Sequence, residues 1–288
     1  MNKKKLTIII MLSIAILTGS YFVAANYGFF SGGTNAPSVP EDTMTRGLVG
    51  YWEFDEGTGS TAYDASGNGN NGTLTNGPKW TAGKSGSALQ FDGVDDYVDC
   101  GESIVVENTD LTLSAWIYVN DLSADERAII AKYDSTANSE RSFLFRVETG
   151  GALSFFTHDG VTQTYKRTAL DSVSIETWYH IAVVYDDSAN DATIYVNSIP
   201  IPNSLQDDTL TNIQDTTTNI TIGSWASAND RMDGSIDSVR IYNRALSAEE
   251  VKYHYNRGGP VASWNFDEGS GTVIHDSSGN GFDGTLNE

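Results

Sequence analysis

The chain has 288 residues, and acidic side chains outnumber basic ones by 38 to 17, which gives a formal net charge of −21. Such a charge repels the phosphates of nucleic acids and anionic lipid head groups, so we expect no nucleic-acid partner. The single cysteine, Cys100, excludes an intramolecular disulfide and is expected to be a small buried apolar group at a strand end.

The N-terminus is typical of an exported protein. A lysine cluster at residues 3–5 precedes an uncharged, apolar stretch that ends at Phe30, and we expect this stretch to form a hydrophobic helix. Two interpretations of residues 1–30 stay open. A break at Gly19 and a small residue at Ala25 favour a cleaved signal peptide, whereas the length of about 25 apolar residues favours a retained membrane anchor.

Both interpretations place the rest of the chain outside the cytoplasm, in an extracellular or cell-surface location. Contact with a membrane is expected only through the N-terminal segment, if it is not cleaved. Residues 31–46 are rich in Gly, Pro, Ser and Thr and lack apolar periodicity, which predicts a flexible linker.

The body of the chain is predicted to be all-β. From residue 47 to residue 243, short alternating or apolar runs rich in Val, Ile, Thr and aromatic residues are separated by clusters of Gly, Asn, Asp and Ser. About eleven strands fit into this length without helical crossovers, which indicates antiparallel pairing and a two-sheet sandwich. We expect the strand around Trp52 to pair with a strand near the end of this region.

One short helix is predicted after the last strand. Ser247 is a favourable N-cap, Glu250 stands three residues later at the spacing of a capping box, and Gly258 follows the helix.

An internal repeat divides the chain. Residues 47–76 align without gaps to residues 259–288, with sixteen identical positions in thirty. We therefore predict one complete domain over residues 47–257 and the truncated start of a second repeat over residues 258–288. A fragment of two strands cannot bury its own apolar face, so we expect this second part to pack poorly.

Both copies retain the side-chain oxygens of the first loop, at Asp64 and Asn68 in the first copy. Two interpretations stay open for them. They either cap turns by accepting hydrogen bonds from the loop amides, or they bind Ca²⁺ together with loop carbonyls and Asp237 of the last strand.

Most aromatic residues fit the core, but Trp225 lies beside a polar loop and could stack on a sugar ring. A ligand-binding face is predicted from Trp225, Tyr165, Asn229 and Asp230.

Several segments in order resemble laminin G-type (LamG-like) jelly-roll domains of the concanavalin A-like lectin/glucanase superfamily. The resemblance rests on "GYWEFDEGTG", "DASGNGNNGTL", "SALQFDGVDDYVDCG", "LTLSAWIYV", "ETWYHIAVVYDD", "ATIYVN" and "MDGSIDSVRIYNRALSAEEV". It implies a two-sheet antiparallel jelly-roll sandwich, often with Ca²⁺, that serves as a module binding a glycan or a cell-surface protein. The last segment also resembles pentraxins, but the loop that corresponds to their acidic calcium loop, "SWASAND", retains only Asp230.

Catalysis is not expected. The chain lacks the Glu-x-Asp-x-x-Glu strand of the glucanases in this superfamily, a nucleophile elbow and a close pair of histidines. Three functions remain: a carbohydrate-binding module, a structural or adhesion spacer in a tandem array, and a domain associated with a glycoside hydrolase.

Overall fold

A computed structural model describes residues 44–123, 126–134, 136–203, 206–225, 230–256, 264–276 and 283–286. The predicted N-terminal helix of residues 1–30 lies outside these residues. None of the helices in the described ranges is long and apolar enough to cross a bilayer.

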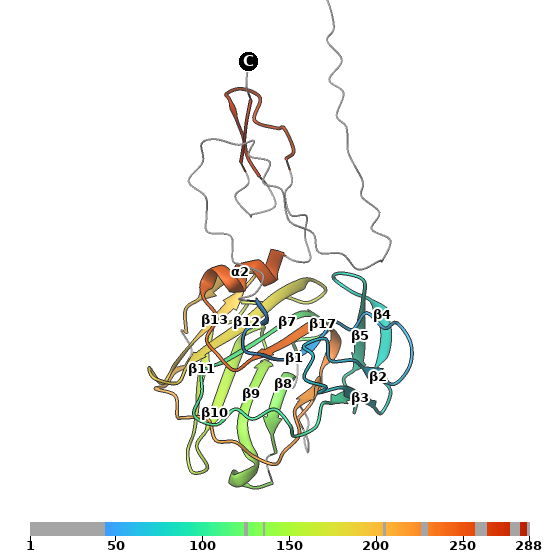
Figure 1. The fold of residues 1–288 in the computed structure, drawn as a ribbon, viewed down its shortest axis with the longest axis vertical. Helices are drawn as coiled ribbons and strands as arrows, with labels where there is room; N and C mark the ends of the chain where they lie inside the picture. Colours follow the sequence, from blue (N-terminus) through green and yellow to red (C-terminus); the bar gives the residue numbers. More distant parts are fainter. Residues whose placement is uncertain are drawn as a thin grey trace, which may run out of the picture. The chain divides into compact units, whose positions relative to one another are not determined.

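The described strands form two large antiparallel sheets, which confirms the predicted sandwich (Figure 1). The first sheet has eight strands in the order β14-β13-β12-β7-β17-β5-β4, with β1 also paired to β17. Its strands are β1 (Leu48–Trp52), β4 (Lys79–Ala82), β5 (Ser87–Asp92), β7 (Leu111–Val119), β12 (Trp178–Asp186), β13 (Asp191–Val196), β14 (Ile199–Ile201) and β17 (Asp233–Tyr242).

The second sheet has nine strands in the order β15-β11-β10-β9-β8-β16-β6-β3-β2. Its strands are β2 (Thr61–Ala62), β3 (Gly72–Thr75), β6 (Tyr97–Asp99), β8 (Arg127–Tyr133), β9 (Arg141–Val147), β10 (Leu153–His158), β11 (Gln163–Arg167), β15 (Gln206–Asp207) and β16 (Thr221–Ile222). A 3₁₀ helix, η1 (Asn138–Glu140), connects β8 to β9.

The core lies between the inner faces of the two sheets. Alternate residues of β7 and β12, such as Leu113 and Ile181, pack in one cluster with Phe145 of β9 and Phe155 of β10. Because successive side chains of a strand point to opposite faces, the remaining residues of the same strands form the outer faces of the sandwich.

The first strand closes the domain as predicted. In β1, Trp52 lies opposite Val239 of β17 and is fully buried in the core. The two ends of the domain are therefore tied together by one antiparallel pair. Cys100 is also buried, as expected, and burial raises the pKa of its thiol.

The predicted helix is α2 (Ala248–Asn256), drawn beside β12 and β13 in Figure 1. The Glu250 carboxylate accepts a hydrogen bond from the Ser247 amide at 2.8 Å, and the Ser247 hydroxyl accepts one from the Glu250 amide at 3.3 Å. This capping box starts the helix, and Val251 packs it against Ala182 and Tyr242 on the outer face of the first sheet.

Candidate functional site

The outer face of the nine-stranded sheet carries a row of side chains that crosses seven neighbouring strands. Directly opposed residues share a face of an antiparallel sheet, so the register places these side chains on one surface. The row consists of Thr73, Asp99, Thr221, Ala131, Leu144, Phe156 and Tyr165. It is polar on the β3–β16 side and apolar on the β8–β11 side.

Four aromatic side chains gather at the apolar end. Tyr165 stacks on Phe156, with ring centroids 4.7 Å apart and planes at 18°. Trp225, which follows β16, meets Tyr133 edge-on with centroids 5.0 Å apart. All four pack in one cluster with Ala128, Ala131 and Leu144, and we call these four aromatic residues the aromatic cluster.

An arginine-centred network borders the aromatic cluster. The Arg146 guanidinium lies 4.5 Å from the centre of the Phe156 ring and forms ion pairs with Asp230 at 2.8 Å, Glu148 at 3.1 Å and Glu126 at 3.4 Å. Burial raises the pKa of Glu126, and the neighbouring Asp230 carboxyl adds to this rise while Arg146 opposes it. The network therefore fastens the chain after β16 to the sheet.

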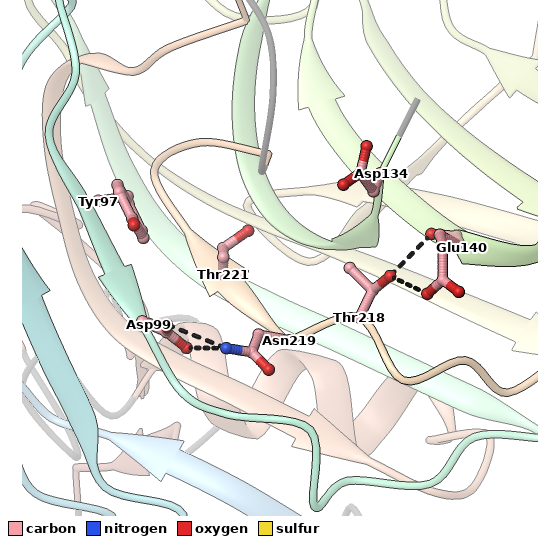
Figure 2. Close-up of a pocket in the computed structure, with 7 residues that line it drawn as sticks. All are labelled: Tyr97, Asp99, Asp134, Glu140, Thr218, Asn219 and Thr221. Carbon is pink, nitrogen blue, oxygen red and sulfur yellow. Dashed lines mark hydrogen bonds between the residues drawn. The ribbon is translucent and has the colours of Figure 1, made fainter. Parts of the chain in front are cut away.

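A pocket of about 390 Å³ opens at the polar end of the row (Figure 2). It is lined by Tyr97, Asp99, Asp134, Glu140, Thr218, Asn219 and Thr221. These residues come from β6, the end of β8, η1 and the segment that leads into β16.

Hydrogen bonds hold the lining side chains in place. The Asn219 side-chain amide donates to both oxygens of Asp99, at 2.9 and 3.0 Å, and the Thr218 hydroxyl donates to the Glu140 carboxylate at 2.8 Å. Figure 2 shows both pairs beside Thr221. Carboxylates, hydroxyls and an amide around one cavity suit a ligand rich in hydroxyl groups, and three carboxylates disfavour an anionic one.

The structure brings most of the predicted ligand-binding residues to one face. Trp225 and Tyr165 both belong to the aromatic cluster, and Asp230 is joined to it through Arg146. Asn229 lies outside the described residues. Sequence reasoning missed Phe156 and the pocket residues.

The predicted calcium ligands of the first loop form hydrogen bonds within the loop and to strand β1. The Asp64 carboxylate accepts hydrogen bonds from the amides of Tyr51 at 3.0 Å, Ser66 at 2.9 Å and Asn70 at 2.9 Å. Burial would raise the pKa of Asp64, but these hydrogen bonds outweigh it and lower the pKa. The Asn68 amide donates to the Leu48 carbonyl at 3.0 Å. This geometry fits the turn-capping alternative.

Asp237 belongs to a different hydrogen-bond network. It is fully buried, and one carboxylate oxygen, Oδ2, accepts from the amides of Lys84 at 2.9 Å and Ser85 at 3.2 Å. Its Oδ1 atom has no hydrogen-bond partner among the described residues. Burial raises the pKa of Asp237 to about 6, and the nearby Asp55 carboxylate contributes to the rise.

Glycines bring the 83–86 loop close to these two carboxylates. A Cβ atom on Gly83 would lie 2.7 Å from Asp237 Oδ2, and one on Gly86, which has a φ of +65°, would lie 2.1 Å from Asp55 Oδ1. A buried carboxylate oxygen without a partner beside a second carboxylate fits a hard divalent cation, which takes several oxygen ligands. Asp237 and Asp55 thus both lie close to the 83–86 loop.

Comparisons with known proteins agree with this fold. A family model described as the concanavalin A-like lectin/glucanases superfamily matches residues 92–252. A search of curated protein sequences found no match.

Three solved structures illustrate the likeness. The binding domain of Paraclostridial Mosquitocidal Protein 1 superposes with a TM-score of 0.61 at 21% identity, over 74% of this chain and 53% of that one. The second structure is domain 4 of AbnA, a GH43 extracellular arabinanase from Geobacillus stearothermophilus, in complex with arabinotriose. Its TM-score is 0.56 at 19% sequence identity, and the match covers 72% of this chain and 97% of that domain. The third structure, Trypanosoma rangeli sialidase, has a TM-score of 0.54 at 17% sequence identity, and the match covers 73% of this chain and 32% of the sialidase chain. This chain thus spans about half of the first structure, and likeness at these identities shows the fold.

Proposed function

The chain belongs to the concanavalin A-like lectin/glucanases superfamily, and on this premise we propose that it is a non-catalytic module that binds a neutral carbohydrate. The observation that carries the proposal is the polar pocket on the outer face of the nine-stranded sheet. Its lining offers hydrogen-bond acceptors at Asp99, Asp134 and Glu140, and hydroxyl groups at Thr218 and Thr221.

The chemistry of the pocket favours neutral sugars over other ligands. Sugar hydroxyls can donate to the carboxylates, and the Tyr97 ring offers an apolar wall for the face of a pyranose or furanose ring. Tyr165 and Trp225, the partly buried members of the aromatic cluster, extend the same face beyond Thr221, which would lengthen the surface for a chain of several sugars. The bound arabinotriose of AbnA domain 4 is a neutral oligosaccharide held by a protein of this fold.

The ion pairs on this face support a role in binding rather than catalysis. Glu148 and Asp230 are each paired with Arg146, and Glu148 is also paired with Arg167. Paired carboxylates are poorly suited to act as nucleophile and acid, because glycoside hydrolysis needs one carboxylate and one carboxylic acid facing the sugar bond. We propose that this network orders the binding face.

The proposed site of action is outside the cytoplasm, either in the extracellular space or at the cell surface. The support is the basic cluster and apolar stretch of residues 1–30, whether it is cleaved or retained as an anchor. Ligands available there include glycans and cell-surface proteins.

A second candidate function is a structural or adhesion spacer. It is favoured by the repeat of residues 47–76 at residues 259–288, which is typical of tandem arrays. A spacer would leave the pocket without a ligand, so the binding experiment separates the two functions.

We expect a glycan array probed with the purified chain to give hits among neutral oligosaccharides. For the best hit, Asn219→Ala should weaken binding at least tenfold, because it removes the side chain that orients Asp99. A tenfold loss corresponds to about 1.4 kcal/mol. Isothermal titration calorimetry measures the change.

Asn212→Ala is the matched control, since its amide also makes a side-chain hydrogen bond, to Asn108, outside the pocket lining. An equal loss in both variants, or no array hit at all, would count against the pocket and in favour of the spacer.

We further propose that Ca²⁺ stabilises the domain at Asp237 and Asp55. A site present only in the folded state contributes about 2.7 kcal/mol when the free ion is at one hundred times its Kd. This corresponds to a rise in Tm of roughly 5–10 °C for a domain of this size. Mg²⁺ should raise Tm less, because it requires tighter octahedral geometry. Differential scanning calorimetry in CaCl₂ and in EDTA tests this.

The variants Asp237→Asn and Asp64→Asn distinguish the two predicted locations. Asp237→Asn should remove the calcium shift, whereas Asp64→Asn should lower Tm but keep the shift, because Asp64 caps the loop. If only Asp64→Asn loses the calcium-dependent rise in Tm, calcium binds in the first loop and not at Asp237. If the unmodified chain melts at the same temperature in CaCl₂ and in EDTA, the domain has no calcium site.

A further inference from the structure

Asn-Gly pairs are positions at which a protein chain is prone to spontaneous deamidation. The Gly amide nitrogen can attack the side-chain carbonyl carbon of the Asn, because Gly has no Cβ atom to hinder the close approach. The sequence contains four such pairs, which begin at Asn68, Asn71, Asn76 and Asn280. Asn280 lies outside the described residues, and the other three differ in how the fold holds them.

Asn76 is the least restrained of the three. It lies in the turn between β3 and β4, and both Asn76 and Gly77 are exposed. Among the described residues, the Asn76 side chain makes one hydrogen bond, in which Nδ2 donates to the Asp95 carbonyl at 2.9 Å. Rotation of the Asn76 Cγ atom toward the Gly77 nitrogen therefore breaks a single side-chain hydrogen bond.

Asn68 is held more firmly. Its Nδ2 atom donates to the Leu48 carbonyl and to the Ser66 hydroxyl, both at 3.0 Å. A reaction at Asn68 must break both bonds. Because a neutral hydrogen bond of typical strength changes an equilibrium by roughly two- to tenfold, the fold should protect Asn68 more than Asn76.

Asn71 is restrained by the strand that follows it. Its Oδ1 atom accepts a hydrogen bond from the Asp64 amide at 2.9 Å. The next residue, Gly72, begins β3, is buried and lies opposite Ala62 of β2. Closing a ring between Asn71 and the Gly72 nitrogen changes the backbone at the start of β3, so the pairing of β2 with β3 must open first.

Deamidation at position 76 would add a negative charge beside an acidic loop. One carboxylate oxygen from each of Asp92, Asp95 and Asp96 lies within 4.8 Å of the others. Burial raises the pKa of Asp96, and the Asp92 and Asp95 carboxylates add to this rise. A Cβ atom on Gly77 would lie 3.7 Å from Asp96 Oδ1, so the turn is close to this loop. The product would also lose the donor that now bonds to the Asp95 carbonyl.

We propose that Asn76 is a site of spontaneous deamidation in the folded protein, and that the reaction releases the turn at residues 76–77 from the loop at residues 93–96. The Gly77 amide nitrogen forms a bond to Cγ of Asn76, the bond between Cγ and Nδ2 breaks, and the amide proton leaves with Nδ2 as ammonia. Water then opens the resulting succinimide at either carbonyl and gives aspartate or isoaspartate. The reaction needs no enzyme, and the proposal is independent of carbohydrate binding.

To test the site, the full chain is incubated in mildly alkaline buffer, and mass spectrometry with peptide fragmentation follows each Asn. In the folded chain, Asn76 should convert at least about threefold faster than Asn68, and Asn71 should convert most slowly. A second sample is incubated in guanidinium chloride, where these differences should shrink because the protecting contacts are lost. Faster conversion at Asn68 or Asn71 in the folded chain, or the same rate ratios in both samples, would overturn the proposal.

The variant Asn76→Asp tests the consequence of the reaction. It should lower Tm by roughly 2–4 °C, because it removes one hydrogen bond and adds a repelling charge. A Tm equal to that of the unmodified chain would overturn the release of the turn.

Asn71→Asp is the matched control for this variant, because the second copy of the repeat already carries an aspartate there. Its strands β18 (Val273–Ile274) and β19 (Gly284–Thr285) pair as β2 and β3 do. The Asp283 carboxylate, at the position aligned with Asn71, accepts a hydrogen bond from the Asp276 amide at 2.8 Å. Asn71→Asp should therefore leave Tm unchanged, and an equal fall in both variants would show that added charge alone, without loss of the bond to Asp95, lowers stability.

Discussion

Replacing Trp52 with alanine is expected to lower the free energy of unfolding by about 3–5 kcal/mol, the usual range for removing a buried aromatic side chain. Trp52 is fully buried, lies opposite Val239 of β17 and donates its indole N–H to the Asn70 carbonyl at 2.9 Å. The change removes core contacts and the hydrogen bond that joins β1 to the first loop. Urea titration followed by circular dichroism measures the loss.

Trp264→Ala is the matched control, because Trp264 occupies the same local structure but is 42% exposed. It should cost less than about 1 kcal/mol, as expected for a partly exposed side chain outside the core of the sandwich. Equal costs at both positions would contradict the assignment of Trp52, and not Trp264, to the core of the sandwich.

The second large effect is expected from His180, whose replacement by phenylalanine should make the protein more resistant to acid. His180 is fully buried in β12 against the ring of Trp116, and neither ring nitrogen has a hydrogen-bond partner among the described residues. Burial lowers the pKa of His180 from 6.5 to about 3, with a smaller contribution from the Arg240 charge.

The sign of the effect follows from proton binding. Between pH 6.5 and pH 3 the unfolded chain binds a proton at His180 that the folded chain does not, so stability falls as the pH falls. The slope approaches about 1.4 kcal/mol per pH unit, which amounts to roughly 3 kcal/mol between pH 7 and pH 4. His180→Phe should remove this part of the acid destabilisation.

Denaturant titrations of both proteins at pH 7 and pH 4 give the comparison, since the carboxylates contribute to both alike. If the two proteins lose the same stability on acidification, His180 is not held neutral in the folded state.

Much of the fold could be predicted from the sequence because its signals are local. Alternation in "LTLSAWIYV" predicts the strand that is β7, and the spacing of Ser247 and Glu250 predicts the start of α2. The expected pairing of the strand around Trp52 with a strand near the end of the domain is found as β1 paired with β17.

The site could be predicted only in part, because it depends on how distant strands align. The position of Trp225 beside a polar loop predicted it as a ligand-binding residue. The residues that it packs against lie on β8, β9 and β10, and the register of these strands is set only in the assembled sheet. The pocket joins Asp99 to Asn219, which are separated by 120 positions in sequence. The bond from Asp237 to the Lys84 amide spans 153 positions.

The most direct test of the proposed function is a crystal structure of the chain soaked with the best oligosaccharide from the array. The account predicts sugar density in the pocket, with hydroxyl groups hydrogen-bonded to Asp99 or Glu140 and a ring against Tyr97. Sugar bound on the outer face of the eight-stranded sheet, with the pocket holding only solvent, would contradict it.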